Sequence, residues 1–134
     1  MRTPTHHYKE FPMNALNWFE IPAAKLERAV KFYEQILAAR LPIDESFPGM
    51  RMAMLPYTEP GVGGCLIEFE QARPHADGVR IYLNAGDDLR PILDRVEGAG
   101  GRIIMPRTFL RDDIGYIGMF SDSEGNIVGL HSLH

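Results

Sequence analysis

The stretch NWFEIPAAKLERAVKFYEQIL, residues 17–37, decides the fold of this chain. Its first part combines aromatic and branched residues that favour a strand, and Pro22 ends that run. From Leu26 onward the apolar residues recur every three to four positions, as they do on one face of a helix. The stretch therefore predicts a strand over residues 15–21 and a helix over residues 26–38.

The same pattern of a strand and then a helix occurs again in the second half of the chain. Residues 78–84, GVRIYLN, predict a strand, and the next segment predicts a helix with Pro91 in its first turn. At a constant offset of 63 residues the apolar faces of the two helices match, pairing Leu26 with Leu89, Ala29 with Ile92, Val30 with Leu93 and Tyr33 with Val96. Further strands are predicted after each helix, over residues 40–44, 50–55 and 65–70, and over residues 102–109, 116–120 and 126–133.

This order predicts an α+β fold of two modules, each a strand, a helix and three strands (βαβββ). Side by side, the modules would form an open, curved mixed sheet around a cavity, with the helices outside. The length of 134 residues fits one domain, which we place over residues 14–134 as modules 14–71 and 78–134. Residues 1–13 show no period and are expected to be a flexible extension.

The composition of the chain argues against two classes of binding partner, nucleic acids and anionic membranes. The net charge of −4 gives no electrostatic footprint for nucleic acid or for an anionic membrane. Cys65 is the single cysteine, so a reducing compartment fits best. Because no run approaches the apolar length of a transmembrane helix or a signal peptide, we expect a cytoplasmic protein.

Strand alternation separates the side chains that face the cavity from those that face the core. Val79, Ile81 and Leu83 are expected in the core under the second helix. The expected cavity side is unusually polar, with two methionines along one wall. Its members are Trp18, Glu20, Met52, Met54, Glu68, Arg80, Tyr82, Asn84 and His131.

These residue types suit the recognition of a small molecule. Arg80 and Asn84 could bind a carboxylate or carbonyl group, because arginine offers a planar fork of donors. Glu20 or His131 could act as a general base, since burial tunes the pKa of either group. The aromatic members could stack on a planar substrate.

A purely structural interpretation of the same residues stays open. Glu20 can form a closed ion pair with Arg80, and Glu68 can sit at a solvated strand end. His131 can be a structural histidine with satisfied hydrogen bonds. Cys65 is better explained as a small buried thiol than as a nucleophile.

Five segments together resemble the vicinal oxygen chelate superfamily, the glyoxalase/bleomycin-resistance/extradiol-dioxygenase fold. They are FEIP (19–22), LERAVKFYEQIL (26–37), GVRIYLN (78–84), GAGGRI (98–103) and FSDSEGNIVGLHS (120–132). The resemblance implies paired βαβββ modules and a homodimer. It also implies a cavity that in many members holds a divalent metal.

The metal positions that the resemblance implies are changed in this chain. Ligands of the first, fourth, fifth and last strands would fall at Leu16, Glu68, Arg80 and Gly129. Only one of these four residues keeps a donor oxygen, whereas a divalent ion needs several protein ligands. We therefore expect no metal at the usual place, and no other cofactor.

The sequence thus predicts a glyoxalase-like protein that binds a small polar or planar metabolite or drug. A lyase or isomerase activity without the usual metal ligands stays open. One alternative is a metal-dependent lyase, isomerase or dioxygenase whose site has moved to Glu20, Glu68 and His131. Another is a non-catalytic dimerising module in which residues 1–13 contact the partner.

Overall fold

The computed structural model describes residues 14–134, and the expected extension over residues 1–13 lies outside the described part. The first module consists of β1 (Trp18–Pro22), α1 (Leu26–Leu37), β2 (Ile43–Asp44), β3 (Met50–Met54) and β4 (Gly63–Phe69). The second consists of β5 (Tyr82–Asn84), α2 (Arg90–Asp94), the 3-10 helix η1 (Glu97–Ala99), β6 (Arg102–Arg111), β7 (Gly115–Ser121) and β8 (Ile127–Ser132). This element order confirms the predicted duplication.

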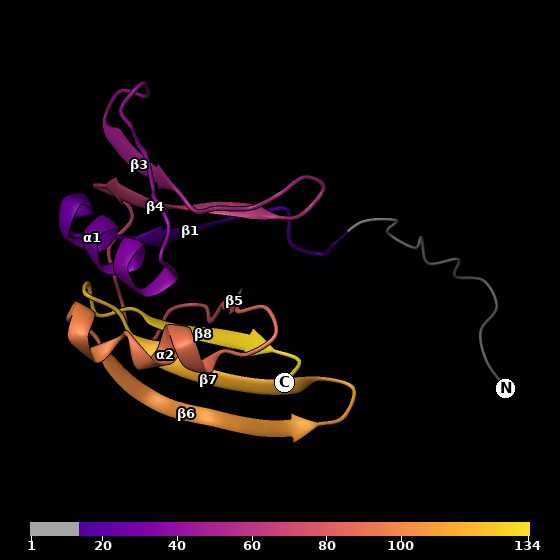
Figure 1. Ribbon diagram of the computed structural model, residues 1–134. Coiled ribbons are helices and arrows are strands. Elements are labelled where there is room, and N and C mark those ends of the chain that lie inside the picture. The colour runs from indigo at the N-terminus through magenta and orange to yellow at the C-terminus, as the bar shows by residue number, and fades with distance from the viewer. Residues whose placement is uncertain (1–13) are drawn as a thin grey trace, which may run out of the picture.

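Each module forms its own four-stranded mixed sheet, in the orders β1-β4-β3-β2 and β5-β8-β7-β6. In both sheets the first strand runs parallel to the last, and the remaining pairs are antiparallel. Figure 1 shows the first sheet above the second, with the edge strands β1 and β5 next to each other in the middle. The α+β class is confirmed, and the expected curved sheet consists of two sheets with adjoining edges.

A single hydrophobic core joins the two modules on the helix side of both sheets. Phe32 and Tyr33 of α1 are buried, and their rings lie 5.8 and 6.1 Å from the ring of Phe120 on β7. Leu89, Leu93 and Val96 of the second module are buried in the same core. Because both helices cover the same side, the opposite side of each sheet, here called the open face, is left uncovered by them.

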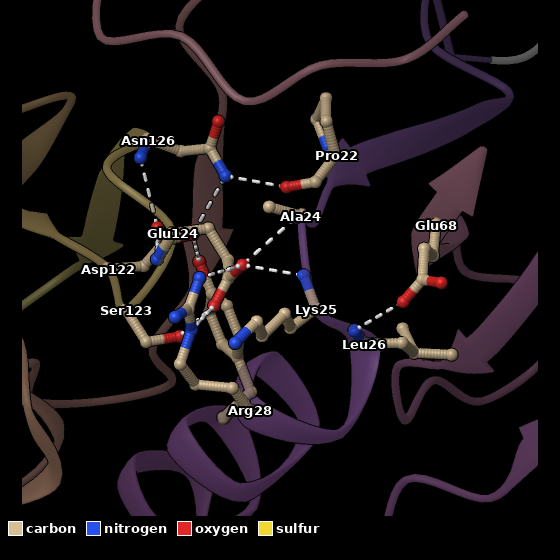
Figure 2. A network of polar contacts seen from close by, with 11 residues as sticks. Pro22, Ala24, Lys25, Leu26, Arg28, Glu68, Asp122, Ser123, Glu124 and Asn126 are labelled. Atoms are coloured by element: carbon tan, nitrogen blue, oxygen red, sulfur yellow. Dashed lines mark hydrogen bonds and ion pairs between the residues drawn. The ribbon is translucent and has the colours of Figure 1, made fainter. Parts of the chain in front are cut away.

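Hydrogen bonds from other segments fix the N-terminus of α1 (Figure 2). Lys25, at the N-cap, makes no capping bond with its own side chain. Instead Glu124, in the turn between β7 and β8, accepts from the N–H groups of Ala24 and Lys25 at 2.9 and 3.0 Å. It also pairs with Arg28 at 2.7 Å. A carboxylate suits this place because the orphan N–H groups and the helix dipole favour negative charge.

The side chains around this turn form a second link between the modules. Asn126 donates to the backbone oxygen of Pro22 at 2.8 Å, and Tyr33 donates to Asp122 at 2.8 Å. Burial raises the pKa of Asp122, although hydrogen bonds from Asn126 and Tyr33 act in the opposite direction. The turn over residues 122–126 therefore joins the second sheet to both β1 and α1.

The strand predicted over residues 78–84 is shorter than expected, because β5 begins only at Tyr82. The expectation that Val79 lies in the core is wrong, since this residue is 94% exposed. Before Tyr82 the backbone forms no continuous ladder, so strand alternation does not govern where Val79 points. No helix among residues 14–134 has the length and apolar character needed to cross a membrane.

Candidate functional site

The open face of the first sheet is apolar. Met52, Cys65 and Ile67 form a buried cluster there, with Met50, Met54, Phe69 and Ala72 packed against it. At the start of β1, Trp18 is 41% exposed on the same side. The structure therefore places Met52, Met54 and Trp18 on the predicted face, where they form an apolar wall.

Cys65 lies in this wall, directly opposite Glu20 of β1. Burial and the neighbouring Glu20 charge raise the pKa of the Cys65 thiol to about 11, although a hydrogen bond from Trp18 works against the shift. The thiol is therefore neutral at physiological pH and lacks the thiolate that a nucleophile needs.

On the open face of the second sheet, three predicted residues come together. Tyr82, Asn84 and His131 line one hollow of about 610 Å³. The ring of Tyr82 lies over Gly129, where an added Cβ would approach ring atoms to 2.3 Å. Tyr82 keeps 44% of its surface exposed. The aromatic face and its polar neighbours are thus accessible to a ligand.

Hydrogen bonds orient the two polar neighbours. Nε2 of His131 lies 2.5 Å from the backbone oxygen of Ile114, which can only accept. Neutral His131 therefore carries its proton on Nε2, and its Nδ1 is the free acceptor. The side-chain oxygen of Asn84 accepts from the N–H of Gly86 at 2.9 Å, which leaves the amide group as a donor.

The alternative in which Glu20 and Arg80 form a closed ion pair is wrong. Arg80 is exposed, and its guanidinium group contacts the sulfur of Met119 at 3.1 Å. Between residues 14 and 134, neither Glu20 nor Arg80 forms an ion pair. Both charges therefore stay available to a ligand.

Glu68 lies on the other side of the sheet, so its expected place in the cavity is wrong. It follows Leu66, which is buried in the helix-side core, with the alternation of a strand. Its carboxylate accepts from the N–H of Leu26 at 2.7 Å and approaches Arg51 at 3.4 Å. Glu68 is thus part of the N-terminal cap of α1.

Glu20 lines a separate cavity of about 210 Å³ between β1 and the segment that links the modules. Arg73 and His75 of that segment line the same cavity, and neither was predicted as a site residue. The sequence carries only a weak signal for them, two basic side chains on either side of Pro74 in the segment predicted to link the modules. The backbone N–H of His75 donates to Asn126 at 3.1 Å, which fixes the linker against the second sheet.

Comparison with known proteins supports the fold and the family. A sequence model of the Glyoxalase/Bleomycin resistance protein/Dioxygenase superfamily matches residues 15–130. The chain belongs to this superfamily.

Individual relatives of this superfamily are distant. A "Glyoxylase-like domain-containing protein" of Didymella fabae is 28% identical over 117 residues, which cover 83% of this chain and 88% of that protein. Glyoxalase I of Zea mays, as a V278E mutant, has a TM-score of 0.67 at 24% identity over 88% of this chain. Only 46% of the maize chain is matched, so this chain spans about half its length.

A second solved structure matches over almost its full length. TnmS3, an antibiotic binding protein from Streptomyces sp. CB03234, has a TM-score of 0.64 at 22% identity. The match covers 92% of this chain and 98% of TnmS3. At this level of identity the likeness shows the fold.

The residues at the expected metal positions do not fit a divalent ion. Leu16 precedes β1, so the first open-face side chain of that strand is Trp18, which is no better ligand. Arg80 and Gly129 supply no donor for a cation, and Glu68 lies on the helix side. The relocated set of Glu20, Glu68 and His131 cannot hold one ion either, because Glu68 lies on the helix side of its sheet. In the described part of the chain, no three His, Cys, Asp or Glu side chains are grouped to hold an ion.

Proposed function

We propose that this superfamily member binds a small polar or planar molecule on its open face, without the divalent metal of many relatives. One observation carries the proposal. Two charged side chains, Glu20 and Arg80, lack ion-pair partners among residues 14–134, and the open face of each sheet carries an exposed aromatic ring, Trp18 on β1 and Tyr82 on β5. Polar groups beside accessible aromatic rings are typical of ligand sites.

The two sheets would make different contributions to binding. The methionine-rich wall of the first sheet offers a deformable apolar surface for a planar group. The second sheet offers the donor groups of Arg80 and Asn84, together with the Nδ1 acceptor of His131. The likeness to TnmS3, an antibiotic binding protein, supports a binding role of this kind.

Trp18 gives a direct test, because it is the only tryptophan in the chain. A library of planar acids and antibiotics is screened by thermal shift, and each hit is then titrated while the Trp18 emission is followed. We expect hits to change this emission and Arg80→Gln to weaken them about tenfold or more, the loss of about 1.4 kcal/mol. Arg102→Gln, an exposed arginine on β6, is the matched control. A library without any stabilising compound contradicts the proposal.

Metal analysis tests the second part of the proposal. Protein purified without chelators should contain no stoichiometric divalent ion. A stoichiometric ion that is lost in Glu20→Gln or His131→Ala would instead favour a metal-dependent enzyme.

We also propose that the chain forms a homodimer, in line with the superfamily resemblance. Phe109 and Leu110, at the end of β6, are 52% and 46% exposed and would be covered by a partner. Sedimentation velocity of the full chain tests this point, and a monomer at all concentrations would contradict it.

A further inference from the structure

The cavity that holds Glu20 has a composition that suggests one class of ligand. We call it the seam cavity, because it lies where β1 meets the linker and the start of β8. Its volume of about 210 Å³ is below the roughly 300 to 1,000 Å³ of sites for drug-sized ligands. The seam cavity therefore fits a compact molecule.

Three polar side chains at the seam cavity have unused hydrogen-bonding capacity. Nδ1 of His75 accepts from the N–H of Asp77 at 3.0 Å, so Nε2 carries the proton and can donate to a ligand. Arg73 and Glu20 form no side-chain hydrogen bond or ion pair within residues 14–134. The cavity thus offers two donor groups and one anionic acceptor.

The rest of the lining is apolar. Ile21 and Val128 are almost fully buried, at 3% and 2% exposure, and Ile81 packs against the same core. Val79 lines the cavity as well, although it is 94% exposed. An aliphatic group in this place would cover Val79 and gain about 25 cal/mol for each Å² of apolar surface buried.

We propose that the seam cavity binds a small aliphatic α-amino or α-hydroxy acid. Arg73 and His75 bind the carboxylate, because a guanidinium fork matches its two oxygens. Glu20 accepts from the ammonium or hydroxyl group of the ligand. The aliphatic side chain lies against Ile21 and Val79. This inference rests on the proposed function, since it names the class of ligand that binds beside Glu20.

Three probes of nearly equal shape test the assignment. L-valine, its 2-hydroxy analogue and isovalerate differ in the group at the second carbon, which is ammonium, hydroxyl or hydrogen. Binding to the full chain is measured by calorimetry. We expect the first or the second probe to bind, and isovalerate to bind about tenfold or more weaker, because it leaves Glu20 unpaired.

Substitutions of Arg73 and Glu20 test which ligand group each of these side chains binds. Arg73→Gln should weaken the probe that binds by about tenfold or more, because the carboxylate loses its cation. Glu20→Gln should weaken L-valine more than the hydroxy analogue, since only the ammonium group loses an ion pair. Both residues are exposed, so the variants should fold, which circular dichroism checks. Arg102→Gln should bind like the unchanged protein.

The outcomes separate this inference from the proposed function. If isovalerate binds as tightly as the other two probes, the role of Glu20 is overturned. If no probe binds while library compounds still alter Trp18 emission, the ligand class is wrong and the open-face site stands. If neither probes nor library compounds bind, both proposals fail.

Discussion

The two modules share one topology but place the same contact on opposite faces of their sheets. In each module, an aromatic side chain of the first strand lies over a glycine of the last strand. Phe19 lies over Gly64, and Tyr82 lies over Gly129. Phe19 packs against the helix-side core, whereas Tyr82 stands 44% exposed on the open face. The pairing of strands is thus the same in both halves, but the use of each face is not.

This difference gives the modules unlike open faces. The first is lined by a buried cluster around Met52 and Cys65, and the second by accessible polar groups beside Tyr82. The two modules share only the core on the helix side, so the residues on their open faces can differ. Each half of a duplicated fold can therefore offer a ligand a different kind of surface. The following substitutions test how separate the halves are.

The largest expected effect comes from Phe120→Ala. The ring of Phe120 belongs to the second module and packs on Phe32 and Tyr33 of the first. We expect a loss of about 3–5 kcal/mol in the free energy of unfolding, the usual cost of truncating a buried phenylalanine. Urea denaturation should show a single unfolding transition in the unchanged protein and in the Phe120→Ala variant. Two separate transitions would mean that the modules unfold independently.

Alanine at the two paired glycines compares the faces directly. Gly64→Ala brings a Cβ within 2.5 Å of the core-packed Phe19 ring and should cost about 2–3 kcal/mol. Gly129→Ala should cost about 1 kcal/mol or less, because the exposed Tyr82 ring can turn away. Thermal denaturation gives both values. In a protein that already carries Tyr82→Ala, Gly129→Ala should no longer cost stability. Equal costs at Gly64 and Gly129 would contradict the proposed difference between the two faces.

Glu124→Gln tests the link between the modules at the start of α1. Burial raises the pKa of Glu124, but hydrogen bonds from Arg28 and the Lys25 N–H outweigh it and lower the pKa below its usual value. Because the pKa of Glu124 is lower in the folded state, its carboxylate stabilises the protein at pH values above 4.5, the pKa of the unfolded state. This stabilisation is lost as the pH falls through the lowered pKa of the folded state.

At neutral pH we expect Glu124→Gln to cost about 1–2 kcal/mol, since charge-assisted hydrogen bonds become neutral ones. Unfolding measured from neutral to acidic pH should show this difference shrinking as the carboxylate is protonated. Glu97→Gln, in exposed η1, is the control and should change little. A difference that grows in acid would refute the capping role.

The smallest effect concerns the Cys65 thiol, which reports on the first open face. Because the Glu20 charge contributes to its raised pKa of about 11, Glu20→Gln should shift the pH profile of the Cys65 S–H Raman band, which needs no reagent to reach the buried thiol, to lower pH. The free energy of unfolding should stay nearly constant. An unchanged profile would mean that Glu20 points away from Cys65.

The sequence predicted the element order, both helices and their apolar faces, because the spacing of hydrophobic residues reflects local burial. It did not predict that one core joins the two modules. It misplaced Glu68, because a shift of one residue moves a side chain to the other face of a strand. It misplaced Val79, where the ladder ends early. It also missed Arg73 and His75, because their position depends on contacts between linker and sheet that no local pattern records.

The cap of α1 has a consequence for synthesis on the ribosome. The N–H groups of Ala24 and Lys25 leave the exit tunnel long before Glu124 has been translated. Until then the nascent helix lacks its carboxylate partner from the second module and the ring of Phe120. The first module therefore completes these contacts only after residues 120–126 of the second module have been translated.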